Sequence, residues 1–221
     1  KEALESQINA HFLCNTLGAI NYSAMENGDM EVSVLLKNLS GILYYVFSKE
    51  TKSVNFGEEI DWVRQYLYLQ KFRLMDVFDY EIIFPEEYNE WPCCKLFLQP
   101  FVENSILHGF EGWEKGGKIS ITGEEQEGRL VLKVADNGSG MAPKIKTEIQ
   151  EVLSGEATLA CNQIGVGISN AAARLRMYYG PEMEIRLETA EGKGSCFTFW
   201  LPIPADILKE SMEELSEEEI G

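Results

Sequence analysis

Residues suited to recognising a nucleotide base stand at the end of an apolar run, RLVLKVADNGSGM (129–141). The carboxylate of Asp136 can accept a hydrogen bond from an exocyclic amine such as the 6-amino group of adenine. Gly138 and Gly140 lack side chains and would let the backbone approach the base closely. The same run also has a purely structural explanation, because Asp, Asn and Gly fill tight turns for backbone reasons.

Two further stretches offer groups for phosphates and a cation: GVGISNAAARL (165–175) and PFVENSILHG (100–109). Gly165 and Gly167, at the start of an expected helix, would expose backbone N–H groups to anionic oxygens, helped by the helix dipole. Asn104 offers a neutral oxygen to Mg²⁺, which keeps most of its waters and takes phosphate oxygens as other ligands. A lone Gly-x-Gly is weak evidence for phosphate binding.

The order of these boxes is more informative than any one of them. An asparagine on a helix precedes Asp-x-Gly-x-Gly at a strand end, then Gly-x-Gly before a helix, then GKGS (192–195) before a strand. The residues concerned are Asn104, Asp136, Gly138, Gly140, Gly165, Gly167 and Ser195. This order resembles the ATP-binding domain of the Bergerat-fold ATPases, shared by histidine kinases, DNA gyrase and heat-shock chaperones, and it implies ATP and Mg²⁺ as cofactors. His108 also matches the family, although a helix-end histidine that bonds carbonyl groups is a simpler explanation.

A histidine in the N-terminal half fits the same family. QINAHFLCNTL (7–17), with His11, resembles the phosphoacceptor box of sensor histidine kinases similar to the autolysis regulators; FGEEIDWVRQYLYLQKFRL (56–74) and LQPFVENSILHG (98–109) resemble their next stretches. The resemblance implies that His11 takes the γ-phosphoryl group of Mg-ATP and passes it to an aspartate on the receiver domain of a response regulator. A largely neutral imidazole has a free lone pair for this attack.

Two side chains are candidates for helping this chemistry. Phe12 stands where commoner histidine kinases have an acidic residue, so Glu103, beside Asn104, is the motif candidate for the base. A carboxylate that only satisfies a helix or lid contact explains Glu103 at least as well. Asn15, four residues after His11, shares its helix face and could orient a water for dephosphorylation of the partner. Hydrogen bonding inside a helical bundle is an equal alternative for Asn15.

The elements that must position these residues begin with two helices. Apolar side chains recur at steps of three and four from Leu4 to Met25 and again from Val32 to Val46, separated by the turn residues 27–29. This predicts an antiparallel helical hairpin. Its apolar seams are too wide for two helices alone, so we expect a homodimer that forms a four-helix bundle. Asn55-x-x-Glu58 predicts a capped third helix, from Glu58 to Leu74.

Beyond the third helix the apolar period changes to that of strands. Strands are expected at 79–84, 118–123, 129–135, 184–188 and 196–202, and helices near 96–108 and 167–179. The fold class is therefore α+β: a helical hairpin followed by an α/β sandwich of Bergerat type, with a mixed or antiparallel sheet and helices on one face. The expected domains are a helical phosphotransfer domain (1–76), an ATP-binding domain (77–204) and an acidic tail (205–221). The polar interval from Met141 to Ile164 predicts a mobile ATP lid that carries a short helix.

Composition narrows the possible partners. The 221 residues carry 19 basic and 36 acidic side chains, a net charge of −17 that disfavours nucleic acid. Five cysteines without C-x-x-C spacing suggest neither a disulfide framework nor a zinc site, and fit a reducing cytosol. No apolar run reaches the roughly 18 residues of a membrane span. Because the chain starts at Lys1 without a methionine, we expect a fragment of a longer protein. The resemblance to sensor histidine kinases implies the cytoplasmic portion of a membrane-anchored bacterial protein, with any membrane segment outside this chain.

Two rival interpretations follow from the same boxes. A Bergerat-fold serine kinase of the anti-sigma type would share the ATP-binding domain but leaves the His11 hairpin unexplained. A catalytically degenerate scaffold would bind ATP and dimerise without chemistry.

Overall fold

The computed structural model describes residues 2–48, 53–155 and 163–202. They fall in two compact units: Lys1–Lys52 with Ile60–Asp76, and Ser53–Glu59 with Val77–Gly221. The first will be called the helical unit and the second the sheet unit. The predicted acidic tail lies outside the described residues.

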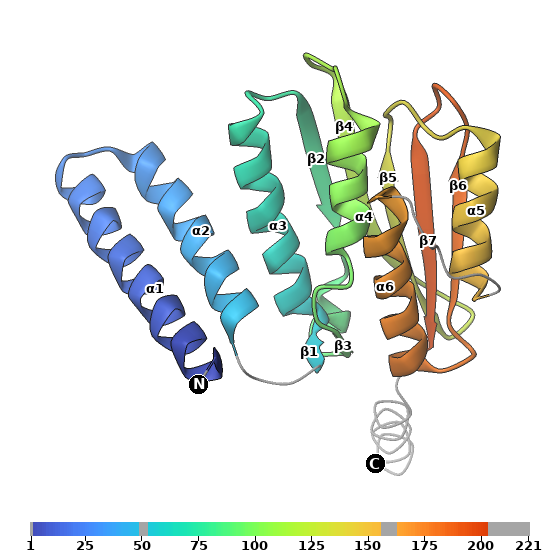
Figure 1. Ribbon diagram of the computed structural model, residues 1–221, viewed down its shortest axis with the longest axis horizontal. Coiled ribbons are helices and arrows are strands. Elements are labelled where there is room, and N and C mark those ends of the chain that lie inside the picture. The colour runs from blue at the N-terminus through green and yellow to red at the C-terminus, as the bar shows by residue number, and fades with distance from the viewer. Residues whose placement is uncertain (1, 49–52, 156–162, 203–221) are drawn as a thin grey trace, which may run out of the picture. The chain divides into compact units, whose positions relative to one another are not determined.

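The helical unit contains the predicted hairpin. Helices α1 (Glu2–Glu26) and α2 (Met30–Phe47) are joined by a short turn in which Gly28 has φ +75° (Figure 1). The Asp29 carboxylate accepts a hydrogen bond from Val32 N and caps α2. Across the hairpin, Ser33 Oγ donates to Asn21 Oδ1 at 2.7 Å. None of the described helices is long and apolar enough to cross a bilayer.

The third helix, α3 (Phe56–Arg73), begins with the predicted capping box. Asn55 Oδ1 accepts from Glu58 N at 2.8 Å, and Asn55 N donates to Glu58 Oε2 at 3.1 Å. Both bonds satisfy amide groups that a helix start leaves without partners. The turn from Phe56 to Glu59 belongs to the sheet unit, and the helix continues into the helical unit.

A five-stranded mixed sheet forms the centre of the sheet unit, in the order β2-β4-β5-β7-β6. Its strands are β2 (Phe78–Ile83), β4 (Gly117–Gln126), β5 (Arg129–Asp136), β6 (Glu184–Thr189) and β7 (Ser195–Pro202). Strand β2 pairs with β4 in parallel, and the other neighbours are antiparallel. Four of the five strands begin and end within one residue of the expected positions, and β4 runs three residues further than expected, to Gln126, so the predicted mixed sheet is confirmed.

Helices α4 (Gln99–Asn104), α5 (Pro143–Ser154) and α6 (Gln163–Tyr179) lie on the same side of this sheet (Figure 1). The core between the two layers is aromatic where Phe101 of α4 meets Phe197 and Phe199 of β7, at ring distances of 5.0 and 4.8 Å. The fold class predicted from the sequence, a helical hairpin followed by a helix-on-sheet domain, is confirmed.

Several short elements were not predicted. Strand β1 (Ser53–Asn55) pairs antiparallel with β3 (Pro92–Cys94), a one-turn helix η1 spans Glu86–Tyr88, and α4 continues directly into a wide turn of helix, η2 (Ser105–Gly109). Strands of three residues are too short to show a recognisable alternation. The η2 turn follows Asn104 and contains His108, two of the residues predicted to form the nucleotide site.

Candidate functional site

A cavity of about 190 Å³ brings together several of the predicted nucleotide-binding residues. It is lined by Asn104, His108, Gly109, Glu111, Gly140, Met141, Ala142, Ile145 and Ser195. These residues come from the end of α4, the η2 turn, the loop after β5, the start of α5 and the start of β7. Segments that are far apart in the sequence therefore meet at one end of the sheet.

Asp136 stands beside this cavity as the last residue of β5 and is held by three hydrogen bonds. Its Oδ1 accepts from Gly138 N (2.8 Å) and Ser195 N (3.2 Å), and its Oδ2 accepts from Ser105 Oγ (2.8 Å). A carboxylate offers about four acceptor sites, so roughly one remains for a donor such as the adenine amine.

Two opposing effects set the pKa of Asp136. Burial raises the pKa above 3.8, and the hydrogen bonds from Gly138, Ser105 and Ser195 partly counteract that rise by stabilising the ionised form. The side chain is half-buried rather than enclosed. It is thus a fixed acceptor in a poorly solvated place, where a hydrogen bond to a ligand is stronger than in water.

The structure explains why glycines are needed at two positions after Asp136, and the sequence did not reveal this reason. A Cβ at Gly138 would lie 2.5 Å from the carbonyl oxygen of Gly109, and a Cβ at Gly140, where φ is +64°, would collide with the carbonyl of Ala190. Backbone therefore packs directly on backbone at both positions. We expected these glycines to make room for the base, whereas protein backbone occupies the space where a side chain would be.

Asn104 is the residue in the cavity with an unsatisfied polar atom. It is 6% exposed, and its Oδ1 is buried without a hydrogen-bond partner in the described part of the protein. A buried acceptor without a donor is costly unless a ligand uses it. An amide oxygen of this kind fits Mg²⁺ or a water on it.

Two residues that the sequence analysis missed hold the site together. Ser105 Oγ donates a hydrogen bond to Asp136. Thr189 is the last residue of β6, and its hydroxyl oxygen accepts from Met141 N at 3.0 Å. The same hydroxyl donates to Gly194 O at 2.8 Å and lies 3.0 Å from Ser195 Oγ. Ser105 could have been found from its place next to Asn104. Thr189 carries no sequence signal, because its partners lie on other segments.

The structure corrects one part of the predicted phosphate site. Helix α6 begins at Gln163 rather than near Gly167, so Gly167 lies beyond the first four residues, whose N–H groups lack partners within a helix. Gly167 is exposed, and a Cβ there would make only an ordinary van der Waals contact, 3.4 Å, with Pro100 of α4, so packing does not require a glycine at this position. Gly165 lies in the first turn of α6, and its immediate surroundings are outside the described residues.

The other predicted residues of the sheet unit lie near Asn104. Glu103 Oε1 accepts from Gln99 Nε2 at 2.8 Å, within the same helix, so a structural contact of the kind weighed above is present. His108 is exposed in the η2 turn and lines the cavity. Neither arrangement excludes a role in the chemistry.

The prediction that residues 141–164 form a mobile lid is wrong for the helix within them, because that helix is packed. This helix, α5, buries Ile149, Val152 and Leu153, so Pro143–Ser154 is a packed part of the helical layer. The helix ends at Gly155, which has φ +86°. The part of the predicted lid at 156–162 lies outside the described residues.

His11 lies on α1 of the helical unit, as predicted, but its side chain is outside the described part. Its neighbour Phe12 is 63% exposed, and Asn15, one turn further on, is exposed as well.

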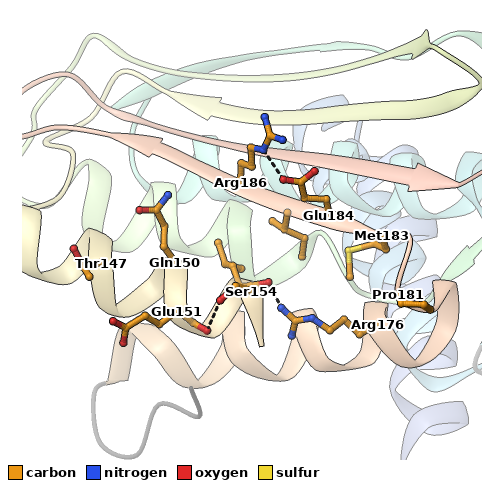
Figure 2. A pocket seen from close by; sticks show the side chains of 11 residues that line it. Thr147, Gln150, Glu151, Ser154, Arg176, Pro181, Met183, Glu184 and Arg186 are labelled. Carbon is orange, nitrogen blue, oxygen red and sulfur yellow. Dashed lines mark hydrogen bonds and ion pairs between the residues drawn. The ribbon is translucent and has the colours of Figure 1, made fainter. Parts of the chain in front are cut away.

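A larger cavity of about 730 Å³ contains none of the predicted site residues. It lies between α5, the end of α6 and β6 (Figure 2), where Arg176 donates to the carbonyls of Val152 and Leu153 and Arg186 pairs with Glu184. Arg176 thus satisfies carbonyl groups at the end of α5. This cavity has a structural explanation and no convergent catalytic groups.

Comparison with known families decides what the chain is related to. Residues 94–205 match the family described as histidine kinase-, DNA gyrase B- and HSP90-like ATPase. The chain belongs to this ATPase family. Residues 1–78 match the histidine kinase family, so the resemblance to sensor histidine kinases drawn from the sequence is confirmed.

Two individual relatives of the chain are also named sensor histidine kinases. The chain is 28% identical over 207 residues to the sensor histidine kinase YesM of Bacillus subtilis and 33% identical over 204 residues to the sensor histidine kinase YpdA of Escherichia coli. These alignments cover 94% and 90% of the chain but only 34% of each relative, so the chain spans about a third of their length.

Among solved structures, the catalytic domain of the histidine kinase ThkA is similar in fold, with a TM-score of 0.51 and 19% identity. That similarity covers 70% of this chain and 96% of the ThkA domain.

Proposed function

We propose that this protein is the kinase portion of a two-component sensor, which phosphorylates His11 from Mg-ATP and passes the phosphoryl group to an aspartate of a response regulator. The observation that carries the proposal is the site itself: Asp136, with room for about one more donor, stands beside a cavity lined by Asn104, whose Oδ1 is buried without a partner in the described part of the protein. The match of residues 1–78 to histidine kinases supports His11 as the acceptor.

Each residue has a distinct part in this proposal. Asp136 would accept the adenine amine, and Asn104 would hold Mg²⁺, which neutralises phosphate charge when bound. Ser195 fixes Asp136 through its N–H, and Gly138 and Gly140 keep the surrounding loop tightly packed. Two further residues, Gly165 in the first turn of α6 and His108, would lie along the phosphates.

The phosphoryl step itself would be a displacement at the γ-phosphorus. The lone-pair nitrogen of neutral His11 forms the N–P bond while the P–O bond to ADP breaks, and the other ring nitrogen then gives up its single N–H proton. Glu103 is the proposed acceptor of that proton, directly or through water, and Asn15 would orient a water for dephosphorylation. Transfer to the aspartate exchanges the N–P bond for an acyl phosphate.

The division of labour and the assembly are also proposals. Residues 1–76 would serve dimerisation and phosphotransfer and 77–204 ATP binding. Large apolar side chains on α1 and α2 are exposed, among them Tyr22 at 65% and Tyr44 at 75%. Apolar surface of this extent usually marks an interface, and a second copy completing a four-helix bundle would cover it. We place the chain on the cytoplasmic side of a bacterial membrane, anchored through segments outside it.

Incubation with γ-labelled ATP and Mg²⁺ tests the proposal. Label that is lost in acid, survives base and disappears in His11→Gln supports it. Acid-stable label would favour a serine kinase instead, and nucleotide binding without any label would favour a degenerate scaffold. The serine kinase alternative leaves the match of residues 1–78 to histidine kinases unexplained.

A further inference from the structure

One buried carboxyl group has no part in the proposed mechanism. Glu59, in the first turn of α3, is 0% exposed, and it is the one acidic or basic residue fully buried within the described part of the chain. Burying a carboxyl group is costly unless donors satisfy its oxygens. A side chain kept at this cost is expected to fix a particular arrangement of its partners.

Both oxygens of Glu59 accept backbone N–H groups from one short segment. Leu96 N donates to Oε2 at 2.8 Å, and Leu98 N donates to Oε1 at 3.0 Å. Leu96 has φ +56°, a left-handed conformation that a leucine adopts only when its surroundings impose it. The hydrogen bond that Leu96 N donates to Glu59 thus stabilises the left-handed backbone conformation of this turn.

That turn leads directly into the helix that carries Asn104. Leu98 is the N-cap of α4, and its carbonyl accepts from Phe101 N and Val102 N in the first helical turn. Asn104 is the last residue of α4, about 9 Å along the helix axis from Leu98 at 1.5 Å per residue. With its N–H on Glu59 and its carbonyl in α4, Leu98 connects the carboxyl group to the start of this helix.

We propose that Glu59 is a positioning residue for the nucleotide site: by holding Leu96 and Leu98 it sets where α4 places Asn104, and thereby the Mg²⁺-dependent part of ATP binding. The inference rests on the proposed function. Glu59 does not line the cavity. Of the three hydrogen bonds on Asp136, only the one from Ser105 comes from the end of α4, so adenine recognition should depend on Glu59 much less than the Mg²⁺ contribution does.

The test compares nucleotide affinity with and without Mg²⁺ in three variants of the full chain. Glu59→Gln keeps the size but replaces one acceptor by an amide group that faces an N–H donor. Glu59→Asp keeps two acceptor oxygens on a shorter stem. The matched control is Glu58→Gln, the same chemical change on the neighbouring, exposed residue, whose bond from Asn55 N a glutamine oxygen can still accept.

Calorimetric titration with the non-hydrolysable analogue AMP-PNP, in Mg²⁺ and in EDTA, gives the gain in affinity that Mg²⁺ provides. We expect Glu59→Gln to reduce this gain about ten-fold, the lower end of losses seen for residues that orient metal ligands. Affinity in EDTA should change less than about two-fold. Glu59→Asp should fall between, and Glu58→Gln should match the unsubstituted protein.

An unchanged Mg²⁺ gain in Glu59→Gln overturns the inference. The inference is also overturned if Glu59→Gln loses affinity equally in Mg²⁺ and in EDTA and has a lowered melting temperature, because a purely structural residue would give that result. If Glu59→Gln does not fold, the Mg²⁺ gain of Glu59→Asp decides by the same criteria. Absence of AMP-PNP binding by the unsubstituted protein would refute the proposed function itself, an outcome distinct from these.

Discussion

Replacing Asn104 by leucine separates a functional asparagine from a structural one. In a protein that needs a buried asparagine for its own hydrogen bonds, such a change costs about 1–3 kcal/mol. Here Oδ1 has no partner in the described part of the protein, so no bond to it is lost. The cavity of about 190 Å³ beside it can admit water, which limits the benefit of removing the amide. We therefore expect Asn104→Leu to leave stability unchanged or raise it by up to about 1 kcal/mol.

The same substitution should remove the Mg²⁺ dependence of ATP binding. We expect the affinity gain from Mg²⁺ to fall at least about ten-fold, while binding in EDTA is nearly retained. Urea denaturation measures the stability, and calorimetric titration with and without Mg²⁺ measures the binding. Asn170→Leu, the same change at an exposed position of α6, is the matched control and should alter neither quantity.

Two results would refute this reasoning. A loss of more than about 1 kcal/mol in nucleotide-free Asn104→Leu would mean that the side chain has a structural partner after all. A full Mg²⁺ gain in a stable Asn104→Leu protein would mean that another group holds the cation.

Three further outcomes are expected. Asp136→Asn should weaken binding of ADP about ten-fold or more. Burial raises the pKa of Asp136 and protonation removes an acceptor, so binding to the unsubstituted protein should weaken as the pH is lowered through that raised pKa; titration calorimetry follows both effects, and pH-independent binding would argue against Asp136. Gly138→Ala should cost about 2–3 kcal/mol in urea denaturation, since its Cβ would lie 2.5 Å from Gly109 O, whereas Gly18→Ala on α1, with nothing within 4 Å, should be neutral or stabilising. Arg176→Met keeps the aliphatic stem but loses the donors to the end of α5, and should cost about 1–2 kcal/mol in the same assay; no loss would show that those carbonyls find other partners.

The buried Asp136 also affects stability with a defined sign. Its pKa is raised in the folded protein, so its contribution is most favourable below 3.8, where it is protonated in both states, and declines as pH rises through the folded pKa. Asp136→Asn should remove this decline, which acid titration of the urea midpoint in both proteins would detect.

Local sequence determined much of the fold. The capping box of Asn55 and Glu58 formed as expected, because its two hydrogen bonds join residues three apart and need no tertiary contact. The strands and the hairpin followed from apolar periods of two and of three to four, which decide the face of each element that must be buried. The order of the asparagine and glycine boxes likewise indicated the family before any contact was known.

Tertiary structure decided how the site is held together. Two of the three donors on Asp136 come from Ser105 and Ser195, 31 and 59 residues away, and no local pattern links such positions. Glycine is needed at position 138 because the backbone of Gly109 occupies the space of a side chain. The helix within the expected lid is packed because its apolar side chains are buried within the sheet unit. Glu59 shows the same limit: in the sequence it is one of two adjacent glutamates in a first helical turn, and only burial against Leu96 and Leu98 distinguishes it from its exposed neighbour. Apolar periodicity and helix capping involve residues a few positions apart, so they can be predicted from the local sequence. Burial and long-range hydrogen-bond partners depend on which distant segments the fold brings into contact, so they cannot.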